Sequence, residues 1–538
     1  MYLSTKNKLV FSLFALTCAS LAVYQSTHTM EVPKASNTFI DTIAAYNPVS
    51  ACLRRTPFAW CILKAAYNTA TCRTAPVWQS DTTQLPDAPT LAKLLHNALH
   101  IKPEQFLWGV GTSAHQVDGH CSPHSCSWAR WEIEQQGKKV QEQAGIACDH
   151  WNLYKEDIAR IKNELGMNTY RFSIEWSRVE PRQGEFDMAA LAHYADVCKT
   201  CIEHGIKPVI GLHHYTDPCW FIDQGGFEKE ENIIHFTTFC ATTCAYLYKH
   251  IVQFIEDEHL MPMICTFNSP SGYAAKGYLQ GDAPPGRQGD MQAMQTVLVN
   301  MLEAHVRTYA AVKQIGGDKF KVGILKNIHQ LYANNPCNPL SQLGACAAQM
   351  LTDEGIFNFF TTGTYNVYMP CMALIEHTNH AAPKSLDFIG LNHYSLGVMN
   401  NFKKDPHPDT TTHTANKNYC ISPESLYLAI KEISTRIAQP LNIPIYITEN
   451  GTAPLHDDAD TKNSFYQHYL SALLKAIQDG YDVRGYITWS FMDNFEWNSG
   501  YSIRYGLYHV DFDNPNLMRT LKQGAYYLRD VVQAYAKA

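Results

Sequence analysis

Three polar side chains stand at the ends of strongly apolar segments, where an unpaired polar group is costly. Asn268, Asn392 and Glu449 each close such a segment. Because a buried amide or carboxylate needs a partner, these side chains are expected to face a functional cleft. Amides and carboxylates can bind ligand hydroxyl groups, and a carboxylate can also act as a nucleophile. Glu449 is therefore the first candidate for covalent chemistry.

The elements that must position these residues follow a repeated pattern of short apolar runs and longer amphipathic segments. This alternation predicts β-α units. The runs of strand length cover residues 106–110, 168–174, 208–214, 263–268, 320–326, 386–392, 444–449 and 484–490. Eight such units indicate an α/β chain folded as a (β/α)8 TIM barrel. In that fold the active site lies at the carboxyl ends of the strands, where Asn268, Asn392 and Glu449 stand.

The composition favours a large globular domain that acts on a small neutral ligand. The 538 residues are 46% hydrophobic and 12% aromatic, which is enough to bury a large core. A formal charge of −7 excludes the basic surface that nucleic acid or an anionic membrane requires. Aromatic rings can stack on sugars, although most of the aromatic residues are expected to serve packing.

Six segments resemble, in order, the motifs of glycoside hydrolase family 1. They are FLWG at 106–109 leading to Gln116, NTYRFSIEWSR at 168–178, HHY at 213–215, DFIGLNHY at 387–394, ITENG at 447–451 and WSFMDNFEW at 489–497. The family includes β-glucosidases, β-galactosidases, phospho-β-glycosidases, myrosinases and klotho proteins. The resemblance implies a β-glycosidase that acts on a β-linked glycoside or oligosaccharide without a metal or organic cofactor.

The resemblance also implies roles for the residues around Glu449. Retaining hydrolysis needs a carboxylate that attacks the anomeric carbon and a carboxylic acid about 5 Å away that protonates the leaving oxygen. Glu449 matches the family's nucleophile. Arg171 and Tyr394 match residues that contact it, where a guanidinium holds the carboxylate ionised and a phenol donates a hydrogen bond.

A second group of residues matches the family's ligands for the non-reducing sugar. These residues are Gln116, His214, Asn268, Glu496 and Trp497, with Trp489 as stacking platform and Asn392 counted beside them. Glu496 can accept hydrogen bonds from two hydroxyl groups at once. Phospho-sugar members of the family generally lack the Glu-Trp pair, so Glu496 and Trp497 favour an unphosphorylated, glucose-like or galactose-like ring.

The sequence departs from the family at Ser269, where the general acid/base is normally a glutamate. A hydroxyl group has no titration near neutral pH, and acid/base assistance is typically worth about 10²–10⁴-fold in rate. One interpretation is therefore a β-glycosidase restricted to good leaving groups, as in myrosinases, which carry Gln here. A second is a catalytically impaired, carbohydrate-binding or receptor-like protein comparable to klothos. A third draws the acid from a loop carboxylate such as Asp282.

The N-terminus carries features of an export signal. Lys6 and Lys8 precede an uncharged stretch at 9–24, which is shorter than the roughly 20 residues that comfortably span a bilayer. The stretch predicts a cleaved secretory signal and an exported protein, periplasmic or extracellular, or otherwise a membrane anchor. We therefore divide the chain into a signal or anchor at 1–24, an N-terminal extension at 25–100 and a barrel at 101–538. Within the extension, short helices are expected at 37–46 and 91–99.

The sequence contains 17 cysteines. In an oxidising compartment, disulfides are expected in the extension, at Cys52, Cys61 and Cys72, and in the loop flanked by Cys121 and Cys126. Cys198 and Cys201 form a C-x-x-C pair, but they lie in an amphipathic helical run and are expected to be packed thiols. The Cys and His spacing predicts no metal site.

Overall fold

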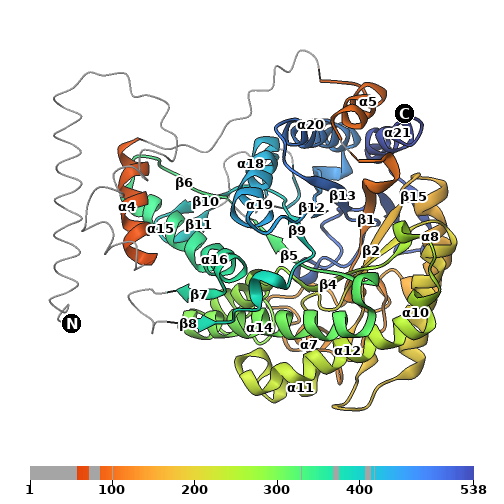
Figure 1. Cartoon of the computed structure of the whole chain (residues 1–538), viewed down its shortest axis with the longest axis horizontal. Coiled ribbons are helices and arrows are strands. Elements are labelled where there is room, and N and C mark those ends of the chain that lie inside the picture. The colour runs from red at the N-terminus through yellow and green to blue at the C-terminus, as the bar shows by residue number, and fades with distance from the viewer. Residues whose placement is uncertain are drawn as a thin grey trace.

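The computed structural model describes residues 57–71, 85–99, 101–328, 330–367, 375–405, 414–416 and 419–538. The predicted signal or anchor and the helix expected at 37–46 lie outside these residues. Eight parallel strands close into a barrel in the order β1-β13-β12-β9-β5-β4-β3-β2, with helices around it (Figure 1). They are β1 Leu107–Gly111, β2 Thr169–Ser173, β3 Lys207–Gly211, β4 Met263–Asn268, β5 Lys321–Asn327, β9 Phe388–Asn392, β12 Ile445–Glu449 and β13 Val483–Trp489. The predicted (β/α)8 barrel is confirmed, and each strand overlaps the run that predicted it.

The outer layer is made of long helices, and several begin at an aspartate that the sequence provides. The helices are α8 His150–Asn163, α10 Met188–Glu203, α12 Ile233–His250, α14 Met291–Gly316, α16 Gly355–Thr362, α18 Pro423–Ile433, α20 Ala459–Gln478 and α21 Tyr526–Tyr535. Asp187, Asp290 and Asp458 accept hydrogen bonds from backbone N–H groups in the first turns of α10, α14 and α20. A carboxylate there satisfies donors that have no partner inside the helix.

Short strands form three small sheets in the segments between and after the barrel strands. They comprise β6 Leu331–Ala333 with β10 Gly397–Asn400 and β11 Lys403–Asp405, then β7 Thr364–Val367 with β8 Ile375–Thr378, and β14 Tyr508–Val510 with β15 Arg519–Leu521. Buried side chains of the barrel strands form a compact cluster that includes Val209, Cys265, Leu325 and Ile487. A barrel filled in this way is a packed core rather than a pore.

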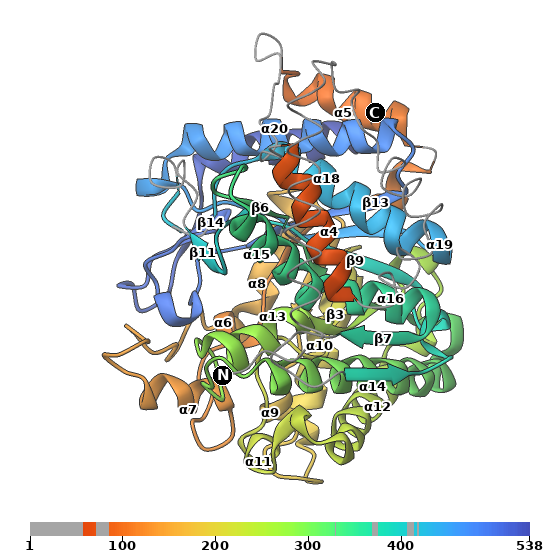
Figure 2. The ribbon, with the colours of Figure 1, turned by 90° about the vertical axis from the view of Figure 1, so that its left-hand side faces the viewer.

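Two helices of the N-terminal extension pack on the outside of the barrel. α4 (Pro57–Ala70) runs beside α15 (Pro339–Gln349), as Figure 2 shows, and the Cys61 thiol lies 3.4 Å from the carbonyl oxygen of Cys346. α5 (Ala88–Ala98) packs against α20 and α21 through Leu91 and Leu95. The helix predicted at 91–99 is therefore confirmed, with an earlier start because Asp87 caps it. α4 was not expected.

The cysteine predictions have mixed outcomes. Cys198 and Cys201 are buried in α10, which confirms that they are packed thiols, and burial raises the pKa of Cys198 to about 12. Cys61, Cys121 and Cys126 are free thiols, so the disulfides expected at these three positions are wrong. Cys52 and Cys72 lie outside the described residues.

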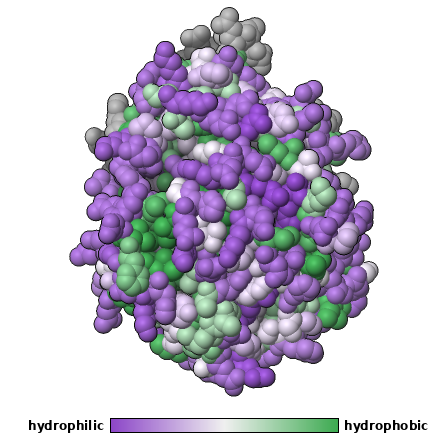
Figure 3. All heavy atoms as spheres, turned by 90° about the vertical axis from the view of Figure 1, so that its right-hand side faces the viewer, coloured by the Kyte–Doolittle hydropathy of each residue, from purple (hydrophilic) through white to green (hydrophobic). Residues whose placement is uncertain are grey.

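The surface in Figure 3 is mixed in hydropathy. Among the residues that the structure describes, no helix is both long and apolar enough to cross a bilayer. The face of the molecule in Figure 3 is mainly hydrophilic, and its hydrophobic residues gather in separate patches. Patches of that kind are ordinary on a folded protein.

Candidate active site

Glu449 ends β12 and is held by two donors. Its Oε1 lies 2.6 Å from Nη1 of Arg171, which comes from β2, and its Oε2 accepts a hydrogen bond of 2.6 Å from the Tyr394 hydroxyl. Only 5% of Glu449 is exposed. Burial and the neighbouring carboxylate raise the pKa of Tyr394 well above its ordinary value, so the phenol stays protonated and keeps donating. The arrangement presents an oriented, charge-compensated carboxylate.

The two residues after Glu449, Asn450 and Gly451, fix the end of β12 in place. Asn450 donates to the carbonyl of His393 and accepts from the Tyr486 hydroxyl, each at 2.6 Å. A Cβ added at Gly451 would lie 1.8 Å from the carbonyl oxygen of Trp489, so only glycine permits β12 and β13 to end this close together. These contacts place Glu449 and Trp489 on the same rim of the barrel.

Two asparagines and a histidine continue the network away from Glu449. The Oδ1 of Asn268 accepts from Arg171 Nη2 at 2.9 Å and from Asn392 Nδ2 at 2.8 Å. The ring of His214 lies between Arg171 Nη2 at 3.3 Å and Asn268 Nδ2 at 3.1 Å. Burial and Arg171 hold the pKa of His214 well below its ordinary value, so the ring is neutral and can accept at only one nitrogen.

Ser269 follows β4 in the left-handed region, with φ 49° and ψ 63°, and directly precedes the short helix α13 (Pro270–Ala274), to which its side chain makes no capping hydrogen bond. It is only 2% exposed. Its Oγ lies 3.3 Å from Asn392 Nδ2. Asn392 also donates to Asn268, which in turn accepts from Arg171. The structure thus brings Ser269, Asn268, Asn392 and Glu449 into one network, as the sequence predicted for the ends of the strands.

The remaining predicted sugar ligands lie beside this network. Gln116, in α6 (Ala114–Val117), donates to the carbonyl of Phe495 at 2.8 Å and lies 3.3 Å from Glu496 Oε2. The rings of Trp489 and Trp497 both lie nearly parallel to His214, at centroid distances of 5.7 and 6.2 Å. All the residues that the sequence selected therefore lie in one region of the barrel rim.

Two charged groups bear on whether another side chain could supply the acid that Ser269 cannot. Lys276 was missed by the sequence interpretation because no periodicity distinguishes it; it lies in η6 (Ala275–Gln280) with Nζ 5.1 Å from the ring centre of Tyr215. Burial lowers the pKa of Lys276 below its ordinary value, and the charges of Glu496 and Glu449 offset this only in part. Asp282 is exposed, and its carbonyl, not its carboxylate, accepts from Asn498. No hydrogen bond joins the Asp282 carboxylate to Ser269 within the described part of the chain.

Burial also changes the charge of Glu496. Its pKa is raised to about 7, because burial and the Glu449 carboxylate outweigh the attraction of Lys276. Glu496 therefore changes between neutral and ionised forms near neutral pH. The site as a whole can hold a hydroxyl-rich ring between aromatic faces and amides and present its reactive carbon to Glu449.

A parallel (β/α)8 barrel with this carboxylate and this set of polar and aromatic ligands at its rim defines a barrel glycoside hydrolase. The family model of Glycosyl hydrolase family 1 matches residues 100–536, and the chain belongs to that family.

Similar proteins support this family assignment. β-Glucosidase A of Acetivibrio thermocellus is 28% identical over 460 residues, covering 80% of this chain and 98% of its own. The solved structure of a β-glycosidase from Pyrococcus horikoshii is 32% identical, with a TM-score of 0.69, over 81% of this chain and 95% of its own. A Thermotoga maritima family 1 glycoside hydrolase bound to a cyclophellitol analogue has 25% identity and a TM-score of 0.68, over 80% and 98% of the two chains. The protein is a glycoside hydrolase of the β-glycosidase type.

Proposed function

We propose that the protein is a retaining β-glycosidase in which Glu449 is the nucleophile and no carboxylic acid serves at the position of Ser269. The observation that carries the proposal is the pair of 2.6 Å contacts from Arg171 and Tyr394 to the two oxygens of Glu449. They place a positive charge and a hydrogen-bond donor on the carboxylate and aim it, which an anomeric nucleophile requires and a mere sugar-binding group does not.

The preferred substrates are β-glucosides or β-galactosides with good leaving groups. Ser269 has no proton to supply near neutral pH, so an alkoxide leaving group would depart without assistance. An activated aglycone needs no such help, and its release would form the glycosyl-enzyme normally. Hydrolysis of that intermediate would then be slow, because no general base activates water.

A carbohydrate-binding or receptor-like protein is the second candidate, and Ser269 is the observation that favours it. Such a protein needs the sugar ligands Gln116, Glu496 and Trp497, but it does not need a nucleophile. The two candidates therefore differ in whether Glu449 forms a covalent bond.

Covalent labelling tests the proposal. A 2-fluoro-β-glucoside with a dinitrophenolate leaving group should add one glycosyl mass to the protein, on the peptide that contains Glu449. Glu449→Gln should abolish the added mass while sugar binding stays measurable. Labelling of another carboxylate, or binding without any labelling of the unmodified protein, would reject Glu449 as the nucleophile.

A further inference from the structure

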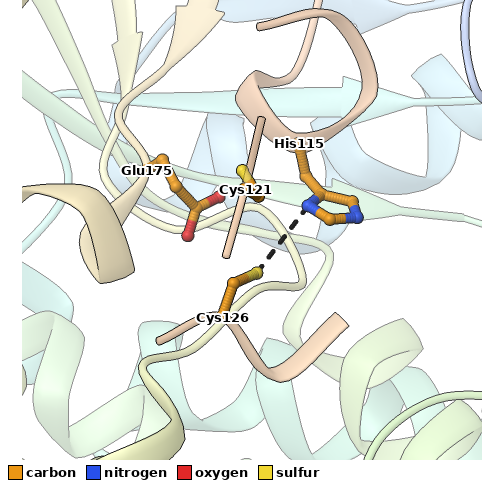
Figure 4. A group of neighbouring side chains, drawn as sticks. All are labelled: His115, Cys121, Cys126 and Glu175. Atoms are coloured by element: carbon orange, nitrogen blue, oxygen red, sulfur yellow. Dashed lines mark hydrogen bonds between the residues drawn. The ribbon is translucent and has the colours of Figure 1, made fainter. Parts of the chain in front are cut away.

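A second cluster of reactive side chains lies beside the sugar site but takes no part in it. His115, Cys121, Cys126 and Glu175 point toward one another, as Figure 4 shows. One ligand atom from each, a nitrogen, two sulfurs and an oxygen, lies within 4.8 Å of all the others. The first three come from the segment after β1, and Glu175 is brought to them by the turn after β2.

The separation between Cys126 and His115 suits a tetrahedral metal centre. Metal–sulfur bonds of about 2.3 Å and metal–nitrogen bonds of about 2.1 Å place neighbouring ligand atoms about 3.4–3.8 Å apart. The Cys126 sulfur lies 3.7 Å from Nδ1 of His115. His115, Cys126 and Glu175 are buried, and Cys121 is partly exposed, which leaves an entry path for an ion.

The histidine is already oriented as a metal ligand. Its Nε2 lies 2.6 Å from Oε1 of Glu132, while the other oxygen of Glu132 accepts from the backbone N–H of Ala144 at 2.9 Å. A carboxylate on the far nitrogen fixes the proton there and leaves the lone pair of Nδ1 facing the Cys126 sulfur. Metal-binding histidines in proteins are commonly held by such an outer carboxylate.

The carboxylate ligand is held as firmly as the histidine. The Oε1 of Glu175 accepts from the Ser177 hydroxyl at 2.7 Å, and its Oε2 accepts from the Thr216 hydroxyl at 2.8 Å. Oε1 also accepts from the backbone N–H of Ser177 at 3.3 Å, so Oε2 is the oxygen that keeps a lone pair for a further partner. Arg178 supplies one positive charge, 3.8 Å from the Cys121 sulfur. A divalent cation would balance the two charges that remain on two thiolates and one carboxylate.

We propose that His115, Cys121, Cys126 and Glu175 bind a divalent metal ion of the zinc class as a closed structural site. Four protein ligands leave no open position for substrate, so the ion would stabilise rather than catalyse. The ring of His115 lies 5.9 Å from that of Trp497 and parallel to it within 12°, and Gln116 follows His115 in the chain. The ion would thus fix the loop that supports the sugar site. The spacing of the ligands is irregular, which is why the sequence predicted no metal.

Metal analysis of the full-length protein, purified under reducing conditions and loaded with Zn²⁺, tests the proposal. We expect about one zinc per chain after desalting, and near-complete loss of it in Cys121→Ser and Cys126→Ser. Cys219→Ser is the matched control, because the Cys219 sulfur contacts the carbonyl of Pro123 in the same loop but lies outside the cluster. Circular dichroism would verify that the variants fold.

Two further measurements do not depend on cysteine variants. Co²⁺ loading of the unmodified protein should give a thiolate-to-cobalt charge-transfer band, and Glu132→Gln should weaken Zn²⁺ affinity about 10–100-fold in competition with a chelator. Failure of the reduced, unmodified protein to bind either ion would overturn the proposal. The proposal would also be overturned if Cys121 and Cys126 form a disulfide and the two thiols bind no metal after that disulfide is reduced. Cobalt that binds without the thiolate band would overturn it as well.

Discussion

At the scale of single residues, the site combines a well-supported carboxylate with the hydroxyl group of Ser269, at the position where the resemblance to the family implies a second carboxyl group. Glu449 has its guanidinium and phenol partners, and Ser269 lies in the same hydrogen-bond network through Asn392. Under the proposed function, the first half of a retaining mechanism is therefore provided for, and the proton transfer is not.

Restoring the missing acid should restore activity on unactivated substrates. Ser269→Glu is expected to raise the rate on simple alkyl or aryl β-glucosides by about 10²–10⁴-fold, the usual contribution of a positioned acid/base. Ser269→Gln, which has the same shape but no transferable proton, is the control. Steady-state rates decide the matter: equal rates for the Glu and Gln variants would mean that the cleft is remodelled or that another group supplies the acid.

Sugar binding should depend on pH through Glu496. Its pKa of about 7 is above the ordinary value, so the carboxylate is ionised above that pH and neutral below it. Because an ionised carboxylate is the better acceptor for sugar hydroxyls, affinity for a neutral sugar such as glucose should fall about ten-fold as pH drops through 7. Calorimetric titration at several pH values measures this.

Two variants make that pH dependence specific. Glu496→Gln should flatten the profile, and Lys276→Met should move its midpoint to higher pH, since the lysine charge favours the ionised form of Glu496. A midpoint that stays in place in both variants would assign the titration to another group.

At the scale of elements, the fold was predictable because the strands carry a local signal. β12 reads Ile-Tyr-Ile-Thr-Glu, an apolar strand ended by its functional residue, and β4, β9 and β13 likewise end at Asn268, Asn392 and Trp489. The contacts of Lys276 and Glu175 could not be predicted, because they depend on how loops from different strands meet. α4 was also missed, since its packing partner, α15, lies far away in the sequence.

The docking of α5 should contribute to stability. Leu95 is fully buried against the barrel, whereas its neighbour Leu94 is 39% exposed. Leu95→Ala should lower the free energy of unfolding by about 2–5 kcal/mol, and Leu94→Ala should change it by less than about 0.5 kcal/mol. Denaturant unfolding of both variants tests this. Equal, small effects would show that α5 is not integral to the folded barrel.

At the scale of the whole molecule, the chain is a family 1 barrel with helices of its N-terminal extension packed on the outside. Loops at the rim of the barrel carry predicted sugar ligands such as Gln116, Glu496 and Trp497. The proposed metal site lies under one of those loops, so its loss should loosen sugar binding before it affects the barrel. The central claim nevertheless concerns the rim itself: Glu449 attacks, and the second step lacks its base.

The most direct test is rapid release of dinitrophenolate from a dinitrophenyl β-glucoside by stoichiometric protein, with and without azide. We predict a burst of about one equivalent and then slow turnover that azide accelerates, because azide attacks the glycosyl-enzyme without needing a general base. No burst at saturating substrate would contradict nucleophilic attack by Glu449. A burst followed by fast turnover that azide does not change would contradict the absence of an acid/base.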